Sequence, residues 1–228
     1  MYQQMIVPQN IEQTRKFYAT DEELIEDIGK AYQDVIKQFY AAGCRNLQLD
    51  DCTWGAIVGD VAKQRYQSLG VDIEEVKARL LKVNNLALEN RPEDMVITSH
   101  ICRGNYHSTF FTSGPYDSVA DYVFAQEHVD ALLLEYDDER SGGFAPLAKV
   151  SPDKKVVLGL ITTKKPELED KDKVIARIHE AAKYIPLDRL CLSPQCGFAS
   201  CEIGNKLTEE QQWAKLALVK EIAEEVWK

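Results

Sequence analysis

The stretch MVITSHICRGN, residues 95–105, joins a short apolar run to a polar segment that carries His100 and Cys102. The apolar part has few alternating polar residues, which is typical of a parallel strand covered on both faces. Similar short apolar runs occur at residues 46–50, 131–136, 156–161 and 189–194. We therefore expect a sheet of about five parallel strands.

Segments with helical periodicity separate these runs. The first covers residues 21–42, with Thr20 and Glu23 in the positions of a capping box and Gly43 at its end. Further helices are expected over 56–68, 72–89, 116–128, 169–185 and 207–227, with a loop and one short helix within 141–150. Repeated strand–helix units predict an α/β fold with a parallel sheet, either a barrel or a doubly wound sheet. No linker or repeat divides the chain, so residues 1–228 are predicted to form one domain.

The composition excludes several classes of protein. The chain has 228 residues and a formal charge of −10, which argues against nucleic-acid or anionic-membrane binding. No run approaches the roughly 18 apolar residues of a membrane span, and the first residues lack a signal-peptide pattern. We therefore expect a cytoplasmic protein whose six cysteines are thiols or metal ligands rather than disulfides.

Polar residues stand at the ends of several expected strands. Among them are His100, Cys102, Glu135 and Cys196. Because the carboxyl ends of parallel strands meet at one rim, these side chains are expected to converge. Zinc takes cysteine sulfur, histidine nitrogen and carboxylate oxygen in a tetrahedral set, so the four predict a Zn²⁺ site. Two thiolates and a carboxylate outweigh the charge of the ion, which favours activation of a substrate thiol over activation of water.

Each of these residues has a simpler alternative. Glu135 alone is compatible with a catalytic acid or with an ion-pair partner of Arg140, and Cys196 alone with a buried thiol. Other side chains compete as metal ligands, namely His107, Asp137, Asp138 and Cys201.

Two further groups are candidates for substrate binding. Asp50 and Asp51 end the first expected strand, where a carboxylate can hold an amino group; the alternatives are a helix N-cap or a salt bridge. Arg103, Gly104 and Asn105 follow the His-x-Cys pair. Arg103 suits a carboxylate or sulfonate, and Gly104 lets the backbone approach a ligand; the alternative is a plain loop with a surface arginine. We predict Asp50, Asp51, Arg103 and Asn105 as substrate-binding residues.

Four segments, in this order, resemble the carboxyl-terminal catalytic barrel of cobalamin-independent methionine synthase, and more closely its short single-barrel relatives. They are AGCRNLQLDD (42–51), SHICRGN (99–105), LLLEYDDERSG (132–142) and LSPQCGF (192–198). The resemblance implies a TIM (βα)8-type barrel in which His100, Cys102, Glu135 and Cys196 hold zinc. It implies that Asp50 holds the amino group of homocysteine. The implied reaction moves a methyl group from a 5-methyltetrahydrofolate-type donor to the thiol of homocysteine, giving methionine.

The chain departs from the family pattern in two places. The first three strands of the family barrel should precede residue 40, so we expect a partial barrel whose exposed edge meets a missing barrel half or another copy. Residues 162–165, Thr-Thr-Lys-Lys, stand where the full-length synthases carry Asp-Ile-His-Ser, so the histidine that assists proton delivery is absent. Two alternatives therefore remain: alkylation of another thiol, such as coenzyme M, and an inactive zinc-binding remnant.

Overall fold

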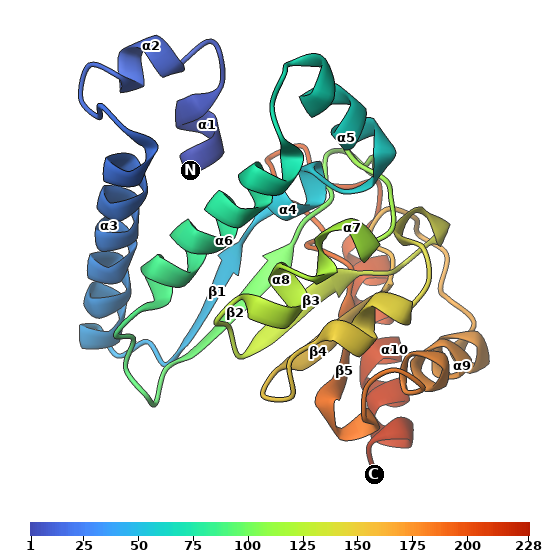
Figure 1. Ribbon diagram of the computed structural model, residues 1–228. Helices are drawn as coiled ribbons and strands as arrows, with labels where there is room; N and C mark the ends of the chain where they lie inside the picture. The colour runs from blue at the N-terminus through green and yellow to red at the C-terminus, as the bar shows by residue number, and fades with distance from the viewer.

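Five parallel strands form the centre of the computed structural model, which describes all residues 1–228 (Figure 1). The strands are β1 (Asn46–Asp50), β2 (Val96–Ile101), β3 (Ala131–Glu135), β4 (Lys155–Ile161) and β5 (Leu190–Pro194). Their order in space is their order in the chain, and every neighbouring pair is parallel. A doubly wound sheet reverses its order at a switch point, so this sheet is a run of consecutive strands from a TIM-type barrel. The predicted fold class, an α/β partial barrel, is confirmed.

Helices precede and connect the strands (Figure 1). Right-handed crossovers between sequential parallel strands place the connecting helices on one face of the sheet. The α-helices are α1 (Tyr2–Ile6), α2 (Ile11–Thr14), α3 (Asp21–Ala41), α4 (Cys52–Ala56), α5 (Gly59–Ser68), α6 (Ile73–Leu88), α7 (Asp117–Ala120), α8 (Val123–Gln126), α9 (Lys171–Ala181) and α10 (Glu209–Val226). Three short 3-10 helices lie at Glu139–Ser141, Ala145–Lys149 and Leu187–Arg189.

Local sequence signals explain where most elements begin and end. The side chain of Thr20 accepts from the backbone of Glu23, and the Glu23 carboxylate accepts from the backbone of Thr20, so the predicted capping box starts α3. Gly43, with φ of 97°, lies just beyond the end of the same helix. The first residues form the short helices α1 and α2.

One predicted helix, over residues 116–128, is wrong. The segment forms α7 and α8, which are separated at Asp121 and Tyr122. Val119 and Ala120 of α7 and Val123 and Phe124 of α8 are buried, so the apolar pattern reflects burial correctly. The chain nevertheless bends at Tyr122, whose hydroxyl reaches outward and donates to Glu74 of α6.

The hydrophobic core lies along the middle strands and the helices that cover them. β3 and β4 are almost wholly buried, whereas β1 shows alternating exposed and partly exposed residues. β1 therefore forms an open edge of the sheet, next to α3 and α6. None of the helices has the length and apolar character needed to cross a membrane.

Candidate metal centre

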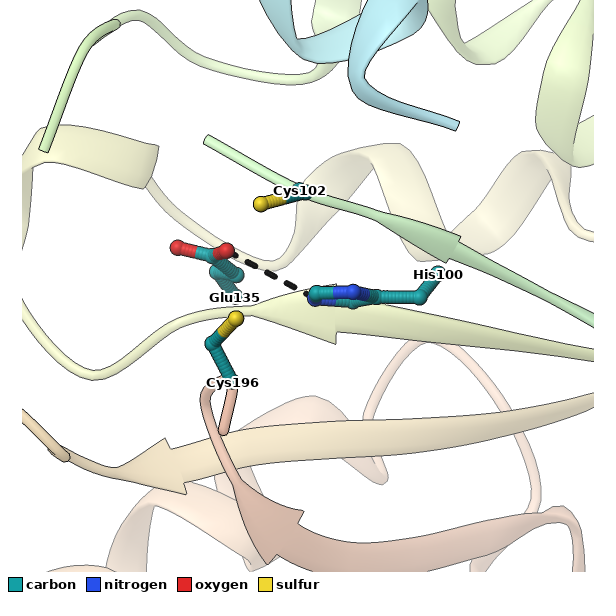
Figure 2. Close-up of side chains that lie close together, drawn as sticks. All are labelled: His100, Cys102, Glu135 and Cys196. Carbon is teal, nitrogen blue, oxygen red and sulfur yellow. Dashed lines mark ion pairs between the residues drawn. The ribbon is translucent and has the colours of Figure 1, made fainter. Parts of the chain in front are cut away.

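The side chains of His100, Cys102, Glu135 and Cys196 meet at the carboxyl ends of the strands (Figure 2). Each offers one ligand atom, and these atoms all lie within 4.8 Å of one another. His100 lies on β2, Cys102 directly follows that strand, Glu135 ends β3, and Cys196 follows β5. The in-register parallel pairing of β2 with β3 and of β3 with β4 aligns these strand ends. The structure thus brings together the four residues that the sequence analysis selected.

Glu135 is fully buried and is held by protein donors on both oxygens. Its Oε1 accepts from the backbone N–H of Arg103 at 3.0 Å, and its Oε2 accepts from Nη2 of Arg140 at 2.9 Å. The pairing with Arg140 that the sequence left open therefore exists alongside the cluster. Arg140 also forms ion pairs with Asp137 and Asp138, the two aspartates that the sequence analysis named as competing metal ligands.

Each ring nitrogen of His100 faces a carboxylate. Its Nδ1 lies 3.2 Å from Oδ1 of Asp50, while its Nε2 lies 3.5 Å from Oε1 of Glu135. Burial lowers the pKa of His100, but the two carboxylates outweigh burial and raise it to about 10. Burial raises the pKa of Glu135, and the contacts with His100 and the Arg103 N–H outweigh it, so the net pKa is lowered.

The two thiols influence each other's ionisation. Contact with Cys102 lowers the pKa of Cys196, and contact with Cys196 raises the pKa of Cys102. Nε2 of His100 is buried and has no hydrogen-bond partner. One imidazole nitrogen, two sulfurs and one carboxylate facing a common point match the donor set that zinc takes in proteins, and Asp50 fixes the imidazole as outer carboxylates do.

Asp50 and Asp51 have different environments. Oδ1 of Asp50 contacts His100 and its Oδ2 accepts from Sγ of Cys52 at 4.0 Å, but the side chain is 58% exposed and so remains accessible to a ligand. Asp51 is the N-cap of α4: its Oδ1 accepts from the Thr53 N–H at 3.0 Å, and its Oδ2 accepts from Asn84 at 2.7 Å. Of the three uses considered for Asp51, the helix cap is the one that its contacts support.

Arg103 and Asn105 do not lie open to a substrate. Arg103 is 1% exposed; its Nη1 donates to the carbonyl of Gly114 at 2.7 Å, and its guanidinium stacks 4.0 Å from the ring centre of Tyr116. Asn105 has both ends of its amide bonded to protein groups. Nε and Nη2 of Arg103 are buried without a hydrogen-bond partner, and the role of Arg103 and Asn105 in substrate binding stays a prediction.

Two residues that the sequence analysis did not select as site residues lie near the cluster. One is Cys52; the other is Lys164, which donates to Gly104 and Asn105 in the loop that follows Cys102. Cys52 forms a second group with Asp50 and Cys102, again within 4.8 Å of one another. Its position two residues after Asp50 repeats the spacing of Cys102 after His100, a signal present in the sequence. His107 and Cys201, the other competing ligands, belong to neither group.

Comparison with known proteins agrees with this geometry. The family described as "Cobalamin-independent synthase, Catalytic domain" matches residues 14–225. The uncharacterized protein YxjH of Bacillus subtilis is 52% identical over 212 residues, which is 92% of this chain and 56% of that protein. The chain therefore spans just over half the length of this relative.

Two solved structures show the same fold. One, from Listeria monocytogenes and assigned as a vitamin-B12-independent methionine synthase, superposes with a TM-score of 0.72 at 39% identity, covering 91% of this chain and 56% of that one. The other, a B12-independent methionine synthase from Shewanella sp. W3-18-1 in complex with selenomethionine, has a TM-score of 0.65 at 21% identity, covering 92% and 56%. At the lower identity the likeness shows the fold alone.

Proposed function

This chain belongs to the family of cobalamin-independent synthase catalytic domains, and we propose that it is a zinc-dependent methyltransferase acting on the thiol of homocysteine. The methyl donor in this proposal is a folate of the 5-methyltetrahydrofolate type. The observation that carries the proposal is the convergence of two thiols, an imidazole and a carboxylate at the strand ends. Zinc bound there supplies positive charge that keeps a substrate thiol ionised near neutral pH.

The residues of the chain have separate tasks in this scheme. His100, Cys102, Glu135 and Cys196 hold the ion, and Arg140 holds the Glu135 carboxylate in place. In the transfer, the sulfur of the substrate thiolate forms the new bond to the methyl carbon while the carbon–nitrogen bond of the donor breaks. The electron pair of that bond stays on the donor nitrogen, which then takes a proton.

Asp50 favours homocysteine over a sulfonate thiol. Its carboxylate is the exposed charged group beside His100, and a carboxylate pairs with the ammonium group of an amino acid. Coenzyme M carries a sulfonate and has no amino group. Arg103, the group that the sequence offered for a sulfonate, is buried against Tyr116. These contacts support homocysteine over coenzyme M as the thiol in this proposal.

Metal content tests the ligand set. The purified protein is expected to hold about one zinc ion per chain, and Cys102→Ser and Cys196→Ser are expected to lose it, because each removes a thiolate ligand. Cys44→Ser is the matched control, since Cys44 lies before β1 and outside both clusters. Cys52→Ser distinguishes the two clusters: loss of zinc in this variant but not in Cys196→Ser would move the ion to the Asp50–Cys52–Cys102 group. Absence of zinc after metal-replete purification contradicts the proposal.

A thiol that lacks the amino group tests the role of Asp50. Homocysteine is expected to shift the thiolate absorption bands of the cobalt-substituted protein, and Asp50→Asn to weaken its binding about tenfold or more, as loss of a charge-assisted bond does. 4-Mercaptobutyrate, which differs only by the missing amino group, is expected to bind the wild type and Asp50→Asn equally. Equal loss for both thiols would assign Asp50 to the orientation of His100 rather than to the substrate.

A further inference from the structure

Asn105 makes four hydrogen bonds through one side chain. Its Nδ2 donates to the carbonyl of Gly197 at 2.6 Å and to Oγ of Ser200 at 2.7 Å. Its Oδ1 accepts from Nζ of Lys164 at 2.9 Å and from Nδ2 of Asn205 at 2.9 Å. A side-chain amide has two donor hydrogens and two acceptor lone pairs, so its capacity is fully used.

These bonds connect loops that leave three different strands. Asn105 lies three residues after Cys102, in the loop after β2, and Gly197 directly follows Cys196, in the loop after β5. Lys164 lies in the loop after β4. The two cysteines come from β2 and β5, which are separated in the sheet by β3 and β4. No sheet hydrogen bond therefore sets the distance between them.

The position of β5 makes this connection more important. β5 is the last strand of the sheet and has a neighbouring strand on one side only, so the loop that carries Cys196 has no strand to support it on the other. Asn105 bonds to this loop at Gly197 and at Ser200, one and four residues after Cys196. It also reaches the segment before α10 through Asn205, which donates to the carbonyl of Thr163 at 2.8 Å.

Lys164 anchors Asn105 from within the protein. The side chain is 8% exposed, and its ammonium donates to the carbonyl of Gly104 at 3.2 Å as well as to Asn105. Burial lowers the pKa of Lys164. Burying an ammonium group costs free energy unless the group is hydrogen-bonded. Breaking the bonds from Lys164 to Gly104 and Asn105 is therefore unfavourable, and these bonds hold the loop from Cys102 to Asn105 in place.

We propose that Lys164, Asn105 and Asn205 are positioning residues that hold the Cys102 and Cys196 loops at the separation needed for one metal ion. This inference rests on the proposed zinc site. None of the three side chains is among the four that would hold the ion; their role in this proposal is to set the geometry of the thiols before the ion binds. Partners of this kind contribute about 10- to 100-fold to metal affinity in other zinc proteins.

Competition with a chromogenic chelator tests this inference directly. Lys164→Met keeps the length of the stem and removes the ammonium, and Asn105→Ala removes the amide; each is expected to weaken zinc binding about tenfold or more. Lys165→Met is the matched control, because the neighbouring Lys165 is exposed and is expected to bind zinc like the wild type. The double variant is expected to lose less than the product of the two single effects, since both remove one shared hydrogen bond.

The cobalt spectrum provides a readout that is independent of activity. The thiolate-to-cobalt bands are expected to weaken or shift in Lys164→Met and Asn105→Ala, and to stay unchanged in Lys165→Met. If Asn105→Ala does not fold, Asn205→Ala, which removes only one of the four bonds to Asn105, is expected to show a smaller change of the same sign.

The outcomes separate this inference from the proposed function. A wild-type protein that binds no metal overturns both. A wild type that binds zinc, together with folded Lys164→Met and Asn205→Ala variants of equal affinity and unchanged cobalt spectra, overturns the positioning role and leaves the zinc site standing.

Discussion

Glu127 is a carboxyl group that the fold removes almost completely from water, with 1% of its surface exposed. Asn84 donates both to its Oε1, at 3.1 Å, and to Oδ2 of Asp51, at 2.7 Å, so two carboxyl groups share one amide. Burial, followed by the nearby charge of Asp51, raises the pKa of Glu127 to about 8 from its ordinary 4.5. The folded protein therefore keeps a proton on Glu127 that the unfolded chain has lost.

This difference predicts a pH-dependent stability. Between about pH 4.5 and pH 8 the unfolded chain binds fewer protons than the folded protein at this site, so the free energy of unfolding falls as pH rises. In urea titrations, Glu127→Gln is expected to remove this decline and to exceed the wild type by a few kcal/mol at about pH 8. Glu93→Gln, at an exposed position, is expected to keep the wild-type slope. Parallel pH profiles for the wild type and Glu127→Gln would mean that Glu127 is charged in the folded protein.

Single residues also show what sequence reasoning reached. The four clustered residues were predictable because parallel strand ends converge, and that geometry needs no side-chain detail. The burial of Arg103 follows from the alternation of strand residues: with His100 and Cys102 facing the site, Ile101 and Arg103 face the core. The saturation of Asn105 was not predictable, because its partners Gly197 and Asn205 are distant in sequence.

Among the helices, α4 has a direct effect on the metal centre. It starts right after β1 and Asp51 caps it; the sequence patterns did not predict this helix, because the one predicted over 56–68 corresponds to α5. Gly55 of α4 lies against the strand end that carries Cys102. A Cβ atom on Gly55 would stand 2.1 Å from the carbonyl oxygen of Cys102, a backbone atom that cannot rotate away. Because Gly55 has no side chain, α4 can pack this closely against the strand end that carries Cys102.

Gly55→Ala is expected to destabilise the protein and weaken zinc binding. Alanine favours a helix over glycine by about 1 kcal/mol, so a loss must come from the clash with Cys102; overpacking of this kind costs about 1–3 kcal/mol. Urea unfolding and chelator competition measure the two effects. Gly143→Ala is the control, because no atom lies within 4 Å of a Cβ built there. An unchanged zinc affinity in Gly55→Ala would show that α4 can move without displacing Cys102.

The elements that sequence reasoning predicted best are those determined by local signals. The α3 cap and the five strands depend on nearby residues, and they lie where the pattern put them to within a residue or two. The division of residues 116–128 into α7 and α8 depends instead on a distant contact. Tyr122 bonds to Glu74 of α6, and a periodic apolar pattern carries no information about such a contact.

At the scale of the whole molecule, the barrel is incomplete, and β1 is one of its two open edges. The chain spans just over half the length of its relatives, and β1 has a strand on one side only. A groove of about 590 Å³ runs along β1 between α1, α3 and α6. Leu47 and Leu49 line it from β1, and Val35 and Phe39 line it from α3, where they are 42% and 48% exposed. Unpaired strand edges beside apolar surface bind other strands or other copies.

A preparation of residues 1–228 is therefore expected to self-associate through this edge. Val35→Lys combined with Phe39→Lys places two charges on the groove and is expected to shift the protein toward monomer, as charged residues do at natural sheet edges. Light scattering after size exclusion, over a range of protein concentrations, measures the shift. Val61→Lys is the control, since Val61 is 81% exposed on α5, away from the residues that line the groove. If the wild-type protein stays monomeric throughout this range, α1 and α3 already protect the edge. If the double variant associates as strongly as the wild type, the contact between copies lies elsewhere.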